Sequence, residues 1–99
     1  MNHKVAIVIA NYNYGDYIVA AMDSILNQTY QGPLRVYVVD DGSSDNSWEK
    51  ISEYQKLYPE KIIGKRIQNS GASVARNVAI EMCWDWADIV GVLDSDDEY

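Results

Sequence analysis

Two clusters of aspartate residues follow apolar runs of this sequence, and their composition suggests cation chemistry. The segment DDGSSD spans residues 40–45, and DSDDEY spans residues 94–99 with Asp94, Asp96 and Asp97. Carboxylates this close repel one another unless a counter-charge is present. Ligand sets made only of oxygen atoms suit Mg²⁺ or Mn²⁺, which share their coordination with substrate phosphates. The second cluster therefore predicts a divalent-cation site, with a solvated acidic tail as the alternative.

Asp40 and Asp41 are neighbours at the end of a predicted strand, so their side chains should alternate in direction. One can lie toward a helix N-terminus, where the helix dipole favours a carboxylate, and the other can point into a crevice. A carboxylate only accepts hydrogen bonds, so we expect Asp41 to accept one from a ligand N–H or hydroxyl group. Gly42 permits a tight turn, and Ser44 or Asp45 would cap the next helix. The alternative for Gly42, Ser43 and Ser44 is that they form only a turn and a helix cap, without any ligand contact.

Two further polar segments carry groups that could contact a ligand. NYNYGDY, residues 11–17, offers Tyr12 as a flat face on which a base could stack. NSGASVARN, residues 69–77, combines the start of a predicted helix with Arg76. A helix N-terminus holds anions, and an arginine can pair with a phosphate or with the aspartates. Ordinary packing of Tyr12 and a structural salt bridge of Arg76 are the alternatives.

The elements that must position these segments alternate between strands and helices. Strands are predicted at residues 5–10, 35–39, 61–68 and 88–93, and helices at 16–28, 45–58 and 73–86. The first two strands are near-continuous apolar runs rather than alternating ones, which is typical of parallel strands covered on both faces. The order predicts an α/β fold, an open, mostly parallel sheet with helices on both faces. Ligands bind such sheets beyond the carboxyl ends of the strands, where all four polar segments would lie.

Composition narrows the possible partners and the compartment. The 99 residues suffice for one small domain, and their net charge of −7 argues against a nucleic-acid partner. Cys83 is the only cysteine, so no intrachain disulfide can form, and its apolar surroundings predict a buried thiol. The apolar run near the N-terminus is too short for a signal peptide or a membrane span. We expect a cytoplasmic protein, with membrane attachment possible only through another chain or region.

Taken together, the four segments resemble the N-terminal half of family 2 glycosyltransferases with the GT-A fold. The resemblance covers essentially the whole chain, with ANYN at residues 10–13 where the family usually has Pro-x-Tyr-Asn. It implies a Rossmann-like subdomain that binds a nucleotide sugar, a UDP-sugar above all. It also implies that Asp94-Ser95-Asp96 is the D-x-D motif, with Asp96 and Asp94 binding Mn²⁺ or Mg²⁺. The implied nucleotide-sugar residues are Ala10, Tyr12, Asp40, Asp41, Asn69, Gly71, Arg76, Asp94 and Ser95.

The resemblance also implies an incomplete catalytic apparatus. Residues 1–99 would be a single truncated donor-binding subdomain, without the acceptor-binding half and its general base, which would follow Tyr99. Inverting transfer to a sugar, lipid or polysaccharide acceptor needs that base. We therefore expect the chain to bind a nucleotide sugar without turning it over. The open sheet edge predicts a homodimer formed by pairing of edge strands.

Two other classes of function compete with this interpretation. A metal-dependent nucleotidyltransferase-like domain would carry a glycine-rich loop with a basic residue after the first strand, whereas NYNYGDY has one glycine and no basic residue. A non-catalytic nucleotide-binding or interaction module would keep the fold without the chemistry. The sequence has no Walker A loop, G-x-G-x-x-G fingerprint, G-x-S-x-G elbow or C-x-x-C pair, which argues against kinase, dehydrogenase, hydrolase and redox functions.

Overall fold

The chain folds into an alternating series of strands and helices, as the sequence predicts. The computed structural model describes residues 3–28 and 32–94, with the backbone alone for residue 94. Element bounds differ from the predicted ones by at most three residues, and the start of the first strand is as predicted. The elements are β1 (Val5–Asn11), α1 (Gly15–Leu26), β2 (Leu34–Asp40), α2 (Ser47–Leu57), β3 (Ile62–Arg66), α3 (Ala72–Cys83) and β4 (Ile89–Asp94).

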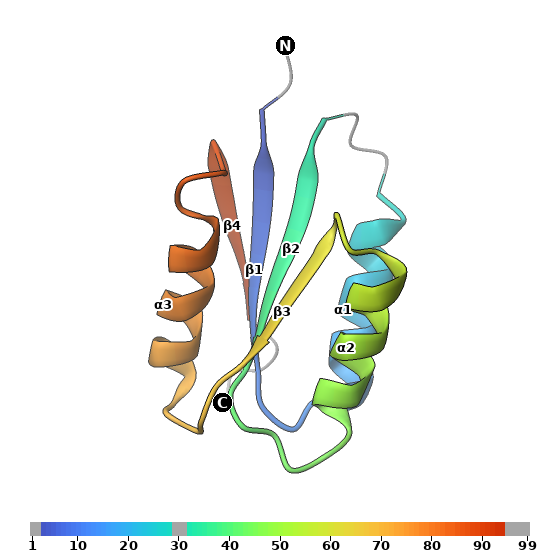
Figure 1. Ribbon diagram of the computed structural model, residues 1–99, viewed down its shortest axis with the longest axis vertical. Coiled ribbons are helices and arrows are strands. Elements are labelled where there is room, and N and C mark those ends of the chain that lie inside the picture. Colours follow the sequence, from blue (N-terminus) through green and yellow to red (C-terminus); the bar gives the residue numbers. More distant parts are fainter. Residues whose placement is uncertain (1–2, 29–31, 95–99) are drawn as a thin grey trace.

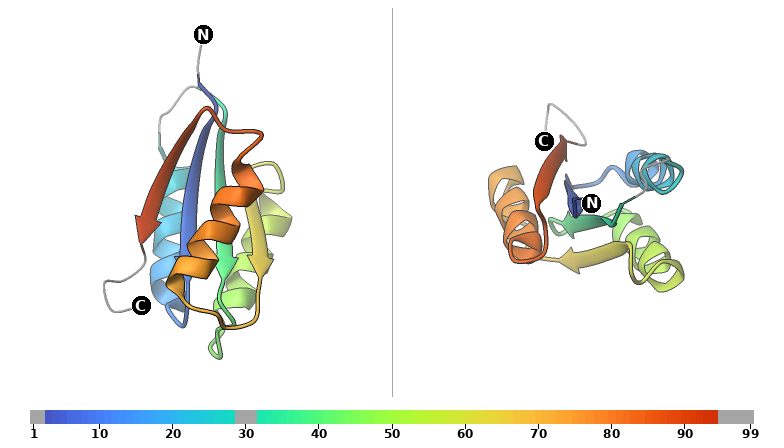
Figure 2. Two further views of the ribbon diagram at one scale, coloured as in Figure 1. Left: turned by 90° about the vertical axis from the view of Figure 1, so that its left-hand side faces the viewer. Right: turned by 90° about the horizontal axis from the view of Figure 1, so that it is seen from above.

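The four described strands form one parallel sheet in the order β3-β2-β1-β4. Helices α1 and α2 lie on one face of the sheet and α3 lies on the other (Figures 1 and 2). This arrangement follows from handedness: successive strands add on one side up to β3, and the chain then crosses back to β4 beyond β1. A right-handed crossover in the reverse direction requires its helix to lie on the opposite face. The reversal creates a switch point beside β1, where open α/β sheets bind ligands.

Each face of the sheet has its own apolar core. On the α1 and α2 side, Ile9 and Val38 pack with Ile18, Met22 and Ile51, and these side chains are fully buried. The other core contains residues of β1, β2 and α3: Ala6, Val8, Ala10, Tyr37, Val39, Ala75, Ala79 and Cys83. Strands β1 and β2 therefore contribute apolar side chains to both faces, which confirms the interpretation of their continuous apolar runs.

Cys83 is a buried core residue, as predicted. Its side chain is fully buried, and burial raises the pKa of the thiol. The third helix ends at this residue rather than at the predicted residue 86. The chain turns there, with the N–H groups of Trp86 and Ala87 bonded to the Cys83 carbonyl, and Trp86 packs beside Tyr37 at a ring-centroid distance of 6.4 Å.

Strand β4 forms one edge of the sheet and exposes apolar side chains. Ile89 is 48% exposed and Val92 is 51% exposed. An unpaired edge strand with apolar side chains is a template for pairing with another strand. This exposure supports the expected homodimer, which stays a prediction. No helix in the described part of the chain is long and apolar enough to cross a membrane.

A hydrogen bond between α1 and α2 gives the fold a pH-dependent contribution to stability. The Tyr54 hydroxyl donates to Asp23 Oδ1 at 2.5 Å, and this bond is the main reason that the pKa of Tyr54 rises to about 12. Because the folded pKa lies above the unfolded value near 10, the stabilisation is complete below about pH 10 and is lost as the pH approaches 12.

We expect Tyr54→Phe to lower the free energy of unfolding by an amount that is constant up to about pH 9 and shrinks above about pH 10. Urea denaturation of the wild type and the variant across this pH range measures the difference. Tyr58→Phe is the matched control, because Tyr58 is 42% exposed on the same side of the molecule. The prediction would be contradicted if the loss of unfolding free energy in Tyr54→Phe were as independent of pH as the loss in Tyr58→Phe.

Candidate functional site

The sheet register places the first residues of the two acidic segments on opposite sides of β1. Asn11 of β1 lies opposite Asp40 of β2, and Ala10 of β1 lies opposite Asp94 of β4. The carboxyl ends of these strands meet at the lower end of the molecule in Figure 1. The two segments that carry the aspartates therefore start one strand apart, at the switch point of the sheet.

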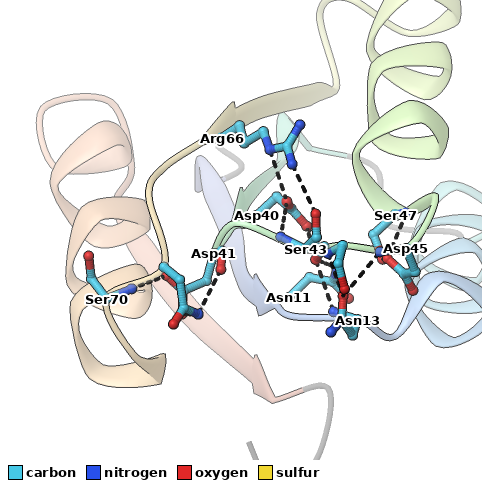
Figure 3. A network of polar contacts seen from close by, with 11 residues as sticks. Asn11, Asn13, Asp40, Asp41, Ser43, Asp45, Ser47, Arg66 and Ser70 are labelled. Atoms are coloured by element: carbon cyan, nitrogen blue, oxygen red, sulfur yellow. Dashed lines mark hydrogen bonds and ion pairs between the residues drawn. The ribbon is translucent and has the colours of Figure 1, made fainter.

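Asp40 directs its carboxylate into the loop between β2 and α2. The side chain is fully buried; its Oδ1 accepts from Asn11 Nδ2 at 3.0 Å and from Ser43 Oγ at 2.6 Å (Figure 3). Its Oδ2 accepts from the Ser43 N–H at 3.0 Å. All of these donors belong to the chain itself. The structure thus assigns Asp40 to the organisation of the loop, and a nucleotide contact by this residue stays a prediction.

Arg66 at the end of β3 supports the same loop, and it was not among the predicted site residues. Its Nη2 donates to the Ser43 carbonyl at 2.9 Å, and its Nε lies 3.8 Å from Asp40 Oδ2 (Figure 3). The register pairs Asp40 with Arg66 across two adjacent strands. This cross-strand pairing would have indicated the role of Arg66. It could not be predicted, because the predicted third strand ended two residues too late and gave no register.

Asp41 faces the other way, toward the N-terminus of α3. Its Oδ1 accepts from the Ser70 N–H at 2.7 Å, and its Oδ2 accepts from the Gly71 N–H at 2.9 Å and from Asn69 Nδ2 at 3.3 Å (Figure 3). The predicted alternation of the two aspartates is confirmed. The aspartate at a helix N-terminus is, however, the one that we expected in the crevice.

This geometry joins predicted site residues from two loops and leaves Asp41 some accepting capacity. Asn69 and Gly71, which were predicted to belong to the same site as Asp41, both donate hydrogen bonds to its carboxylate. A carboxylate oxygen has two lone pairs, and Oδ1 of Asp41 accepts one hydrogen bond among the described residues. Asp41 is fully buried in this structure, so a ligand would reach it only after the covering atoms move.

Gly42 is required where the two loops touch. Its φ is +71°, and a Cβ atom added there would lie 2.8 Å from the backbone nitrogen of Asn69. Gly71 has a φ of +103°, but an added Cβ would meet no atom within 4 Å. Both positions favour glycine for backbone reasons, and only Gly42 also lacks the space for a side chain.

We expect Gly42→Ala to lower the free energy of unfolding by about 2–4 kcal/mol, because it combines an unfavourable φ with a collision against backbone atoms. Gly71→Ala carries the unfavourable φ alone and should cost about 1–2 kcal/mol. Urea denaturation of both variants measures the difference. Equal losses would show that the contact between Gly42 and Asn69 does not constrain the loops.

Asn13 and Asp45 connect the loop after β1 to the loop after β2. Asn13 adopts a φ of 56°, and its Oδ1 accepts from the Ser44 N–H at 2.7 Å and the Asp45 N–H at 3.2 Å. Asp45 in turn accepts from the Gly15 N–H at 3.1 Å. Asn13 was not among the predicted site residues, although a polar residue that tolerates positive φ is a usable signal in such a loop.

The predicted N-cap of α2, Ser44 or Asp45, was wrong by two residues or one. Asn46 is the N-cap and makes no side-chain capping bond. Asp45 precedes it and accepts from the N–H and the hydroxyl of Ser47, the first residue of the helix. Burial acts to raise the pKa of the Asp45 carboxyl, but the hydrogen bonds from Ser47 and Gly15 outweigh it and lower that pKa.

The remaining predicted residues lie along the same edge or outside the described part of the chain. Ala10 is 4% exposed, and Tyr12 and Arg76 are half-buried on the segment after β1 and on α3. For Asp94 the structure gives the backbone at the end of β4. Ser95, Asp96 and Asp97 lie outside the described residues, and no group of three potential metal ligands occurs within residues 3–28 and 32–93.

Comparison with known families decides the lineage of this chain. The model of the family described as glycosyl transferase family 2 matches residues 6–99. The chain belongs to this family. Its match extends over all four polar segments, and it confirms the resemblance drawn from their sequences.

Proteins with curated names match nearly the whole of this chain. The minor teichoic acid biosynthesis protein GgaA of Bacillus subtilis (strain 168) is 34% identical over 96 residues, which are 95% of this chain and 22% of GgaA. The chondroitin synthase of Escherichia coli is 37% identical over 94 residues, which are 94% of this chain and 13% of the synthase. The chain therefore spans less than a quarter of the length of these two relatives.

A solved structure confirms the predicted fold. The mannosyltransferase PcManGT from Pyrobaculum calidifontis, in complex with GDP-Man and Mn²⁺, superposes with a TM-score of 0.79 at 24% identity. The match covers 97% of this chain and 28% of PcManGT. Fold and family together identify the chain as having the Rossmann-like N-terminal architecture of a GT-A glycosyltransferase.

Proposed function

We propose that this chain is the donor-binding subdomain of a glycosyltransferase and binds a nucleotide sugar at the carboxyl edge of the sheet. The observation that carries the proposal is the register that places Asp40 and Asp94 on either side of β1. A ligand centred on the end of β1 would meet both acidic segments at once. Membership of glycosyl transferase family 2 and the likeness to a structure that holds GDP-Man and Mn²⁺ support the same assignment.

The base of the nucleotide belongs on the side of β1 that faces β2. Ala10 lies near the end of β1 and Tyr12 directly follows this strand, and Asp41 lies beyond the adjacent strand. In this proposal Tyr12 stacks on the base, and the remaining lone pair of Asp41 Oδ1 accepts a base N–H. Asn69 and Gly71 hold the Asp41 carboxylate, and Arg76 and Ser95 complete the nucleotide-sugar site.

The diphosphate belongs on the side of β1 that faces β4. Asp94 and Asp96 supply the carboxylate oxygens that Mn²⁺ or Mg²⁺ prefers, so the donor chemistry of this segment fits such an ion. When bound, the ion would offset the negative charge of the leaving diphosphate. Asp94 is the last residue of β4, at the carboxyl end of the sheet.

We assign the acceptor site and the general base for inverting transfer to the part of the protein that longer relatives have beyond this region. A sugar, lipid or polysaccharide hydroxyl is the proposed acceptor. One relative, the poly(ribitol-phosphate) beta-glucosyltransferase of Bacillus spizizenii, is 36% identical over 96 residues and is named for a polymer substrate. The chain by itself is proposed to bind its donor without turnover.

Titration calorimetry with UDP, GDP and ADP, each with and without MnCl₂, tests the proposal. Saturable binding of at least one of the three nucleotides that tightens with Mn²⁺ is the expected result. Selectivity among them would identify the base of the donor. If none of them binds with or without the metal, the chain is an interaction module and the proposed function is wrong.

A further inference from the structure

A second concave site lies at the opposite end of the sheet from the candidate donor site. It is a cavity of about 450 Å³ at the amino ends of the strands. Those strand ends lie in the upper part of Figure 1. Its lining includes Lys4 just before β1, Arg35 at the start of β2 and Lys61 just before β3. Pro33, Glu60 and Trp86 also line the cavity and would take part in recognising a ligand.

The cavity is positively charged in an acidic protein. Three cationic side chains and the single carboxylate of Glu60 line it, whereas the whole chain carries a net charge of −7. Within the described residues the salt bridges join Lys50 to Asp16 and Arg66 to Asp40, so the cavity cations have no carboxylate partner among them. Three unpaired cations at one concave place are available to an anion.

The guanidinium of Arg35 is held in position before any ligand arrives. Its central carbon lies 4.2 Å from the ring centroid of Trp86, and its Nη1 donates to the Tyr37 hydroxyl at 3.2 Å. A guanidinium has five N–H donors, and this hydrogen bond uses one of them. A fixed fork of this kind loses less side-chain entropy when it binds an oxyanion than a mobile lysine does.

We propose that this cavity binds the phosphate group of a small molecule. The three cationic side chains and the one carboxylate of its lining give a formal charge of +2. This charge matches a phosphate dianion better than a single carboxylate. Arg35 supplies the bidentate fork, and Lys4 and Lys61 supply ammonium donors from the flanking strands. Trp86 and Pro33 offer apolar surface for the organic part of a phosphate ester. The site is independent of the donor site, because it lies at the other end of the strands.

Inorganic phosphate is the probe that tests the proposal, titrated at constant ionic strength and followed by two-dimensional ¹⁵N NMR. The expected result is saturable shifts of the backbone amides of Lys4, Arg35 and Lys61 and of the Trp86 indole N–H. Arg35→Gln and Lys61→Gln should each weaken phosphate binding about tenfold. Lys65→Gln is the matched control, since Lys65 is exposed on β3 outside the cavity, and it should change the affinity less than about twofold.

Thermal melts of the three variants check that each is folded, and Lys61→Gln keeps the test decisive if Arg35→Gln unfolds. Equal weakening by Lys61→Gln and Lys65→Gln, or the absence of saturable shifts, would overturn the proposal. Vesicles of phosphatidylcholine with phosphatidylglycerol distinguish a lipid surface from a small molecule. Lys61-dependent sedimentation with these vesicles, without a response to inorganic phosphate, would assign the patch to a membrane and likewise overturn the proposal.

Discussion

Asp40→Ala is expected to lower the free energy of unfolding by about 3–5 kcal/mol, the range for breaking a buried charged network by removing one partner. The Asp40 carboxylate is fully buried and accepts three hydrogen bonds, two from Ser43 and one from Asn11. Without it, the Ser43 donors lose their acceptor and Asn11 Nδ2 keeps only the long contact with Ser43 Oγ at 3.5 Å, and each poorly satisfied buried group opposes folding. Urea denaturation at neutral pH measures the loss.

Asp16→Ala is the matched control for this prediction. It also removes one carboxylate, but the Asp16 side chain is fully exposed and pairs with Lys50 at 3.4 Å. A solvent-exposed pair and an acidic residue in the first turn of α1 each contribute little, so the same urea denaturation should show a far smaller loss of unfolding free energy than for Asp40→Ala. If the two variants were equally stable, the Asp40 network would not support the fold, and its hydrogen bonds would have to be replaced by water.

The sheet core was predictable because its physical requirement is visible in the sequence. A strand buried on both faces needs apolar side chains at nearly every position, and residues 5–10 and, after Arg35, residues 36–39 show this pattern directly. Polar segments at the carboxyl ends of the strands then indicate the edge that binds a ligand. The location of the candidate site therefore follows from composition and order alone.

The detailed geometry of that edge was not predictable in the same way. Which of Asp40 and Asp41 faces α3 depends on the face that α3 covers, and that depends on the strand order β3-β2-β1-β4. Several strand orders are compatible with the same alternation of elements. The pairing of Asp40 with Arg66 likewise depends on register, which hydrogen bonding between distant segments determines.

The observed partners also change the meaning of the paired aspartates. Asp40 holds the loop after β2 through Ser43, and Asp41 holds the loop after β3 through Ser70 and Gly71. Two neighbouring residues thus connect loops on opposite faces of the sheet. Any ligand contact by Asp41 takes place on a carboxylate that the protein has already oriented, which reduces the entropy lost on binding.

Asp96→Asn is expected to abolish the enhancement of nucleotide binding by Mn²⁺, and this is the largest functional effect that follows from the proposed donor site. Asparagine keeps the size of the side chain but replaces a charged oxygen ligand with a neutral amide, which a hard divalent cation binds far less well. The loss of one charged ligand should weaken binding in the presence of Mn²⁺ at least about tenfold. Affinity without the metal should stay unchanged.

Two further variants show whether a change in binding arises at the diphosphate end or at the base end of the ligand. Asp85→Asn removes the same charge from an exposed residue after α3 and should leave nucleotide binding as in the wild type. Asp41→Asn should weaken nucleotide binding with and without Mn²⁺, because it changes the proposed base contact and not the metal ligand. Equal Mn²⁺ dependence in Asp96→Asn and the wild type would remove this residue from the metal site. The proposed diphosphate end of the ligand would then need other ligands.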